Sequence, residues 1–324
     1  MTTTAPSSPS PSRSPRLWAV VLLLVAVLSD LAASFWMAAQ SHRWLPVAAS
    51  AAAGPVDDLF ALEVGIGSFI FLGCSGVMLW TLLFNRAPKY DLDNGDPIEG
   101  NLKLEIVWTV IPLVIVMLIA WKAIDVSTTL STLGGKVRVS GGHAAMHGAE
   151  APAAALVAAN DPAAAQPIEV IGRQWSWEFI YPNGVHSSEL HLPEGQRSFL
   201  RLSATDVIHG FYVPAFRLKQ DLIPGSVIDY SLIPTRAGRY RLRDSMFSGG
   251  YFSSNQTDVV VEPPEAYEAW LKQALAQPLR PAANAATDLY NQRLARGDRG
   301  WATVPPAPPP LVHVSADPTA SHEG

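Results

Sequence analysis

The side chains that most often carry redox or metal chemistry are scarce in this chain. Its 324 residues include one cysteine, Cys74, and eight histidines. A single thiol excludes an intrachain disulfide, a metal site with two thiolates and a CxxC redox pair. His143, Met146 and His147 form a small cluster that could bind copper or nickel adventitiously. Its alanine-rich surroundings favour a segment without a specific metal site.

The composition indicates which elements must position these residues. Charged residues make up 16% of the chain against about 25% in soluble domains, 48% are hydrophobic, and the mean hydropathy is +0.16. This balance indicates a membrane anchor that carries a water-soluble domain, and the length predicts roughly two units. The net charge of −5, without runs of Lys or Arg, argues against nucleic acid as a partner.

Two uncharged stretches predict membrane-spanning helices that form a hairpin within residues 56–125. Residues 64–84 give 21 residues without a charge, and a span needs about 20. Residues 106–121 give 16, so Glu105 and the lysine after this stretch should lie at the two membrane interfaces. Apolar sequence continues on both sides of Pro112, which predicts a kink and not an end.

An apolar stretch near the N-terminus allows two interpretations. Arg13 and Arg16 precede the apolar residues 17–28, as in a secretory signal peptide. Asp30 interrupts the apolar sequence, which then continues, and we favour a retained third span over a cleaved signal. Residues 1–44 therefore contain a tail with either a signal peptide or an extra span, and both place the following loop outside.

The distribution of Lys and Arg sets the orientation. The loop of residues 85–105 carries Arg86, Lys89 and Lys103, whereas the loop of residues 38–59 carries Arg43 alone. Positive residues stay in the cytoplasm, so everything after the second certain span lies outside. The C-terminal domain is therefore expected on the periplasmic or luminal side of a cytoplasmic or thylakoid membrane.

The outer part of the chain begins with residues 126–166, an Ala- and Gly-rich stretch expected to form a linker. Residues 167–262 contain short β-type runs separated by turn signals such as Asn183-Gly184. Strands at this spacing, without helical pattern between them, predict a β-sandwich of about 100 residues. The remaining residues 263–324 predict a short helix at 264–276 and then a Pro- and Ala-rich, disordered tail.

Several segments of the chain resemble subunit II of the haem–copper oxidases. They read Leu104-Glu-Ile-Val-Trp-Thr-Val-Ile-Pro112, Gly172-Arg-Gln-Trp-Ser-Trp177 and Asp206-Val-Ile-His-Gly-Phe-Tyr-Val-Pro-Ala-Phe216, the last followed by Lys219-Gln-Asp-Leu-Ile-Pro-Gly225. The resemblance covers about residues 56–271, and Leu45-Pro-Val-Ala-Ala-Ser50 is similar to cyanobacterial members. It implies a membrane-anchored all-β protein in which a transmembrane helical hairpin precedes a cupredoxin-like β-sandwich. In the family this sandwich holds the binuclear CuA centre, which accepts electrons from cytochrome c.

The ligand positions of CuA can be compared residue by residue with this chain. His209 matches the first histidine of the family, and the other ligands come from a loop that reads Cys-x-Glu-x-Cys-x3-His-x2-Met. The residues at those five positions are Asp244, Met246, Ser248, Phe252 and Asn255. Bridging soft thiolates hold the copper pair, and hydroxyl, carboxylate and phenyl groups do not replace them. We therefore expect no metal on this chain and a structural, hydrogen-bonded role for His209.

Three other matched positions carry expectations of their own. Trp175 matches the tryptophan through which electrons enter, but without copper behind it we favour a packing or interfacial role over a vestigial relay. Met246 replaces a glutamate that helps to bind Mg²⁺ between subunits I and II, which puts that contribution in doubt. Glu105 matches the glutamate at the mouth of the K proton channel, so it is either a proton entry or an interfacial residue that ends a helix.

The resemblance and the missing ligands together predict a function. Quinol oxidases of the same superfamily also lack CuA and take electrons from membrane quinol at a site on subunit I. We expect a non-catalytic subunit II of such a complex, an alternative respiratory terminal oxidase that reduces O2 to water and translocates protons. The expected partners are subunits I and III and the lipid bilayer, with haem and CuB on subunit I and no cofactor on this chain.

The residues leave two alternatives open. The chain could be cytochrome c oxidase subunit 2 in a complex that receives its electrons by another subunit or a fused haem. It could also be a membrane-tethered assembly or structural factor that copies subunit II without joining a working oxidase.

Overall fold

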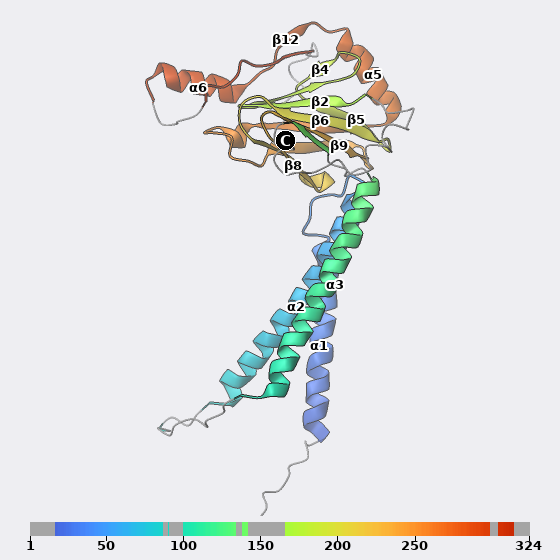
Figure 1. Cartoon of the computed structure of the whole chain (residues 1–324), viewed down its shortest axis with the longest axis vertical. Helices are drawn as coiled ribbons and strands as arrows, with labels where there is room; N and C mark the ends of the chain where they lie inside the picture. The colour runs from blue at the N-terminus through green and yellow to red at the C-terminus, as the bar shows by residue number, and fades with distance from the viewer. Residues whose placement is uncertain are drawn as a thin grey trace, which may run out of the picture. The chain divides into compact units, whose positions relative to one another are not determined.

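The computed structural model describes residues 17–86, 90, 100–133, 138–141, 166–298 and 304–313, with the backbone alone for residues 138–141. Contacts divide the chain into a helical unit, residues 1–44 and 58–119, and a β-rich unit, residues 45–57 and 120–324. Figure 1 shows the helices and strands that make up the two units.

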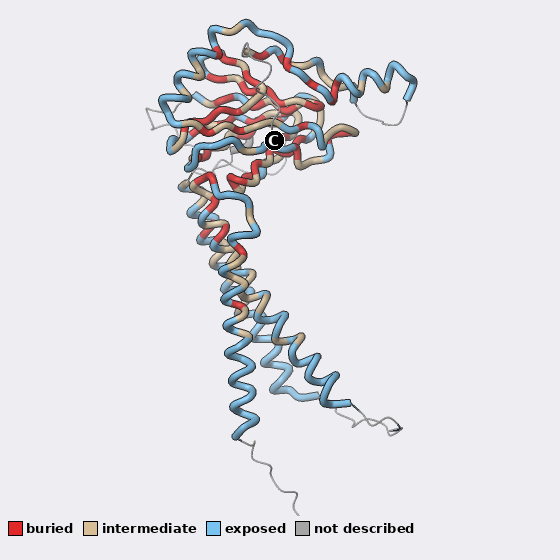
Figure 2. The backbone as a smooth tube through the Cα atoms, turned by 180° about the vertical axis from the view of Figure 1, so that it is seen from behind, coloured by how far each residue is buried: buried red, intermediate tan, exposed pale blue. Residues whose placement is uncertain are grey.

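Among the described residues, three long helices have the length and composition of membrane spans. They are α1 (Leu17–Ser41), α2 (Ala53–Phe84) and α3 (Leu102–Leu133). The shortest has 25 residues, about 38 Å at ~1.5 Å per residue, which exceeds a hydrocarbon core of about 30 Å. The two predicted spans are confirmed as parts of α2 and α3, and α3 continues through Pro112 as predicted. Figure 2 shows that these helices are mostly exposed within the chain.

Small residues let α1 and α2 approach closely within the helical unit. A Cβ added at Gly65 would lie 3.3 Å from the Cβ of Ala38, and one added at Gly73 would lie 3.2 Å from Oδ2 of Asp30. The later glycine of α2, Gly73, lies next to the earlier residue of α1, Asp30, so the two helices are antiparallel. Such small-residue contacts are typical of helix pairs in membranes. They agree with the interpretation of α1 as a third span.

The structure differs from the sequence prediction at the start of the expected linker, residues 126–166. Helix α3 continues to Leu133, and β1 (Arg138–Gly141) pairs with a strand of the sandwich. Hydroxyl side chains in the last turns of α3 bond to carbonyls three or four residues earlier, as Thr129 Oγ1 does to the Asp125 oxygen at 3.0 Å. These bonds satisfy the polar side chains in the last turns of α3, a stretch that was expected to belong to the linker.

Two sheets form the predicted β-sandwich. The first has the order β1-β9-β6-β2-β3-β4, and the second has the order β5-β11-β10-β7-β8. The further strands of the first sheet are β2 (Ile168–Arg173), β3 (Ser176–Ile180), β4 (His186–Ser187), β6 (Ser198–Ala204) and β9 (Ser226–Leu232). Those of the second are β5 (Leu190–Pro193), β7 (His209–Val213), β8 (Leu218–Leu222), β10 (Gly238–Asp244) and β11 (Gln256–Glu262). Most pairs are antiparallel, but β2 runs parallel to β6 and β5 parallel to β11.

One hydrophobic core lies between the sheets, where strand residues alternate between buried and more exposed positions, as in β6. Its fully buried side chains include Phe179, Leu190, Leu200, Phe211 and Leu242. Figure 2 shows this core as red segments along the strands. The fold is therefore the expected membrane-anchored protein with a cupredoxin-like sandwich.

The segment just before α2 packs on the sandwich as part of the β-rich unit. Ala49 donates its N–H to the Ala215 oxygen at 2.9 Å and accepts one from Thr235 at 2.9 Å. Arg217 donates through Nε to Oδ1 of Asp57 at 2.7 Å and through Nη2 to Oδ2 at 2.9 Å. Both side chains are about nine-tenths buried. A bidentate pair of this kind fixes orientation as well as distance.

The C-terminal region is more ordered than the sequence predicts. The helix expected at 264–276 is confirmed as α5 (Pro264–Leu275). The tail expected to be disordered contains α6 (Ala285–Ala295) and a two-stranded sheet of β12 (Leu279–Pro281) and β13 (Leu311–His313). Composition alone misled here, because the Asn284 side chain caps α6 by accepting the N–H of Thr287 at 3.0 Å.

Candidate functional site

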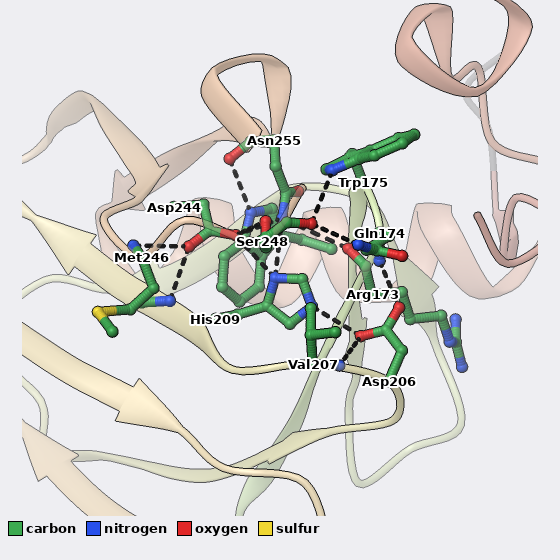
Figure 3. A network of polar contacts seen from close by, with 12 residues as sticks. Arg173, Gln174, Trp175, Asp206, Val207, His209, Asp244, Met246, Ser248 and Asn255 are labelled. Atoms are coloured by element: carbon green, nitrogen blue, oxygen red, sulfur yellow. Dashed lines mark hydrogen bonds and ion pairs between the residues drawn. The ribbon is translucent and has the colours of Figure 1, made fainter. Parts of the chain in front are cut away.

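A polar network lies at one end of the sandwich, where β7 begins and β10 ends (Figure 3). His209 is the first residue of β7, and Asp244 is the last residue of β10. The two strands are paired, with Asp244 opposite Phe211. This pairing brings the start of one strand and the end of the other together, so the histidine and the carboxylate meet although 35 residues separate them.

His209 is completely buried and lies between two carboxylates. Its Nδ1 is 2.7 Å from Oδ2 of Asp244, and its Nε2 is 2.8 Å from Oδ1 of Asp206. Burial lowers the pKa of His209, but the hydrogen bonds to Asp206 and Asp244 outweigh it and raise the pKa to about 9. At neutral pH both ring nitrogens therefore carry protons and donate them to carboxylates.

Asp244 is the centre of the network. Besides His209, its Oδ2 accepts a bond from the Ser248 hydroxyl at 2.8 Å and one from the Asn255 amide at 3.0 Å. Its Oδ1 accepts the main-chain N–H groups of Gly210 at 2.8 Å and Met246 at 3.1 Å. Burial raises the pKa of Asp244, but the bond from His209 and these further donors hold it below its usual value.

The carboxylate on the other side of the imidazole is similarly bonded. Asp206 accepts the N–H of Gln174 at 2.7 Å through Oδ2, and that of Val207 at 2.7 Å through Oδ1. Burial acts against its charge, yet the bond from His209 and these amide bonds lower the pKa of Asp206. Asp206 lies three residues before His209 in the sequence motif, but the motif alone does not predict its contact with the imidazole. The clue in the sequence was that a carboxylate, Asp244, stands at a ligand position while the histidine at position 209 is kept.

Two tryptophans tie the loop after β10 to the opposite sheet. The Trp175 indole N–H donates to the Ser248 oxygen at 3.1 Å, and that of Trp177 donates to the Asn255 oxygen at 3.2 Å. Trp175 is 2% exposed, so its position is internal. A packing role therefore fits the geometry of Trp175 better than a place on the surface.

The approach of this loop to β7 requires a glycine. A Cβ added at Gly210 would lie 2.1 Å from the Ser245 hydroxyl oxygen and 3.0 Å from the main-chain nitrogen of Met246. The loop therefore lies directly on the backbone of Gly210, which lets Asp244 bond to the N–H of both segments. The sequence places Gly210 next to His209, but nothing in the sequence identifies what it approaches.

The structure brings together four of the six positions compared with copper ligands, namely those of His209, Asp244, Ser248 and Asn255. Met246 contributes its main-chain N–H, and its side chain points away from the network in Figure 3. Phe252 packs its ring against Phe247 at 5.2 Å.

The donor set does not fit a binuclear copper centre. The single thiol of the chain is Cys74 in α2, and both nitrogens of His209 already face carboxylates. Within the described residues, no group of three or more His, Cys, Asp or Glu side chains is arranged to hold a metal ion. A copper pair needs bridging thiolates, and the carboxylate oxygens of Asp206 and Asp244 already accept hydrogen bonds.

The other predicted positions lie away from this network. Glu105 is exposed in the first turn of α3, where Asn101 caps the helix by accepting the N–H groups of Lys103 at 3.1 Å and Leu104 at 3.3 Å. A carboxylate in the first turn also interacts favourably with the positive end of the helix dipole. The His/Met cluster at residues 143–147 lies outside the described residues.

Comparisons with known proteins identify the family. Family models match residues 36–126 as cytochrome c oxidase subunit II, transmembrane domain, and residues 185–262 as the periplasmic domain of that subunit. The chain is 35% identical over 289 residues to cytochrome c oxidase subunit 2 of Thermostichus vulcanus, which covers 79% of this chain and 86% of that one. It is 33% identical over 272 residues to the protein of the same name from Synechocystis, with 78% and 81% covered.

A more distant relative carries a different name. Quinol oxidase subunit 2 of Bacillus subtilis is 25% identical over 228 residues, which cover 68% of this chain and 64% of that protein. The predicted resemblance is thus confirmed, and the match to a periplasmic domain places the β-rich unit outside the cytoplasm. From its anchor helices, its sandwich and these matches, this chain belongs to the subunit II family of the haem–copper oxidases.

Proposed function

We propose that this chain is the subunit II of a quinol-oxidising terminal oxidase and that it carries no redox centre of its own. The observation that carries the proposal is the ion-paired network of Asp206, His209 and Asp244. It occupies the place where copper ligands are expected, and both ring nitrogens of His209 and all four carboxylate oxygens have hydrogen-bond partners. Electrons from membrane quinol then enter at subunit I, whose haem and CuB reduce O2 to water with proton translocation.

The network explains how the loop after β10 keeps its shape without copper. Asp244 accepts main-chain bonds from Gly210 of β7 and from Met246 of the loop. The carbonyls of Ser248 and Asn255 accept the indole N–H groups of Trp175 and Trp177. Breaking a buried ion pair leaves an uncompensated charge, which costs about 3–5 kcal/mol. A loop held in this way needs no metal bond.

Two further roles of the chain are structural. The long helices brace the subunit against subunits I and III in the bilayer, and the sandwich covers the outer side of the complex. Glu105 at the start of α3 collects protons at the cytoplasmic surface for subunit I. We expect Glu105→Gln to slow O2 uptake by the complex severalfold, and Glu63→Gln in α2 to leave it unchanged.

Oxygen uptake by the purified complex tests the choice of electron donor. The expected result is brisk uptake with quinol and none with reduced cytochrome c. Rapid turnover with cytochrome c and none with quinol would contradict the proposal.

A second candidate is favoured by the names of the relatives with the highest identities reported above, which are cytochrome c oxidase subunits 2. In that case the chain serves a cytochrome c oxidase whose electrons arrive through another subunit or a fused haem. Uptake with cytochrome c that persists in a complex whose subunit II lacks copper would select this candidate.

A further inference from the structure

The aromatic face around Trp175 is covered by the C-terminal part of the same chain. Trp175 lies in the turn between β2 and β3, a place that sandwiches usually expose. It is nevertheless 2% exposed. The Tyr251 ring meets it edge-on at 5.0 Å, and the Tyr290 ring of α6 lies 5.6 Å away on a tilted plane. Tyr251 comes from the loop of the polar network, whereas Tyr290 comes from the region expected to be disordered.

The segment that carries Tyr290 is fixed at several points. Ala282, Asn284, Ala286 and Thr287 are all buried, so the start of α6 rests on other parts of the chain. The segment begins with β12 and ends with β13, and these strands pair so that Pro281 faces Leu311. His313, the last residue of β13, accepts the main-chain N–H of His186 in β4 at 2.9 Å. The segment therefore leaves the sandwich after α5 and returns to its edge.

The covering segment lies outside the core of the sandwich. The main hydrophobic cluster ends with Ala274 in α5 and contains no described residue of α6, β12 or β13. Neither β12 nor β13 belongs to a sheet of the sandwich. The segment is therefore a separate layer over an already formed fold.

Trp175 is also the aromatic group that connects this face to the buried network. Its indole N–H binds the Ser248 carbonyl, and the Ser248 hydroxyl binds Asp244, which holds His209. A protein partner that needed close access to the network from this side would have to contact Trp175. Tyr290 and the start of α6 already occupy that contact.

We propose that residues 279–298 and 304–313 form an internal cap whose Tyr290 occupies the aromatic face of Trp175 and Tyr251 and closes it to a protein electron carrier. The occupant of this interaction surface is the chain itself. The inference deepens the proposed function, because a subunit that passes no electrons has no use for an open face above its network.

Hydroxyl-radical footprinting of the full complex, read by mass spectrometry at single residues, tests the cap. Ala282 donates its N–H to the Pro310 oxygen at 2.8 Å, so a short Gly-Ser turn can replace residues 283–309 and close a hairpin. We expect oxidation of Trp175 to rise severalfold in this cap-deleted chain and to rise by a smaller factor in Tyr290→Ala. Trp177 is the matched control, because it is also 2% exposed but packs against Phe211 in the core, with ring centroids 5.9 Å apart.

Equal oxidation of Trp175 in the wild-type and cap-deleted chains, with Trp177 protected in both, would overturn the proposal. Oxidation of Trp177 in the cap-deleted chain would also overturn it, because the segment would then be part of the fold of the sandwich and not a separable cap. Neither result depends on the electron donor. If wild-type complex used cytochrome c, the proposed function would fail while the footprint still decided whether the cap exists.

Discussion

Two histidines of the sandwich are buried next to carboxylates at different places in the fold. His209 lies between Asp206 and Asp244 at the end that carries the loop after β10. His191 in β5 lies 3.0 Å from Glu262, and its ring stacks on Trp270 of α5 with centroids 3.7 Å apart. His191 is outside the positions compared with copper ligands, yet it is held in the same manner. Pairing a buried histidine with carboxylates is thus a general way of stabilising this sandwich.

The two sites differ in how completely they are closed. The side chains of His209 and Asp244 are both fully buried, whereas Glu262 beside His191 is 25% exposed. Water can replace part of what His191 loses when its partner is removed, but it cannot do so for His209. The His209 network should therefore respond more strongly to substitution.

The largest effect is expected for Asp244→Ala. It leaves the buried His209 with one carboxylate and frees two main-chain N–H groups, so the free energy of unfolding should fall by about 3–5 kcal/mol. Denaturant unfolding of the full chain in detergent, followed by the β signal in circular dichroism, measures this loss. Glu262→Ala is the matched control, and an equal loss in both variants would contradict the difference between the two sites.

A smaller effect is expected for Gly210→Ala. The added methyl would lie 2.1 Å from the Ser245 hydroxyl oxygen and close to the main chain of the loop, so the loop must move. Overpacking of this kind costs about 1–3 kcal/mol. The same unfolding measurement applies, with Gly184→Ala as a control at a turn that has open space but a positive φ of 85°. Full stability of Gly210→Ala would show that the loop does not rest on β7.

For His191→Ala we expect a loss of about 1–2 kcal/mol, because a ring stack and a partly exposed ion pair disappear. Near-ultraviolet circular dichroism should report the change around Trp270 together with the loss of stability. A loss as large as that of Asp244→Ala would remove the distinction between the two histidines.

Dependence on pH separates the two sites further. His209 has a folded pKa of about 9 against 6.5 unfolded, so its contribution is complete below pH 6.5 and is lost as pH rises through 9. At the other site, Glu189 lies 3.6 Å from Nε2 of His191. The bond from His191, together with Arg239, lowers the pKa of Glu189 from 4.5 to about 2. The contribution of Glu189 to stability is therefore lost as pH falls from 4.5 through 2. Thermal melting between pH 6 and 10 should show a decline that His209→Gln abolishes and His191→Gln retains. A decline retained in His209→Gln would contradict the assignment.

The sequence predicted those parts of the molecule that depend on local pattern. The uncharged residues 64–84 and the alternation along β6 each follow from one period and one environment. The end of α3 at Leu133 was missed because hydroxyl side chains bond back to their own helix. The order of the C-terminal tail was missed because α6 depends on a single cap at Asn284 and on contacts with a distant aromatic face.

The candidate site shows the same limit. Alignment of the loop with a ligand pattern identified which positions had changed, but not what Asp244 does there. The contact of Asp244 with His209 and the close approach at Gly210 result from the pairing of β7 with β10, which brings distant residues together.

The copper content of the purified oxidase, measured against its haem and combined with electron paramagnetic resonance, tests the central claim most directly. The account predicts copper at the level of CuB in subunit I alone and no signal of a binuclear mixed-valence centre. Copper in excess of CuB that remains with this chain and gives such a signal would contradict it.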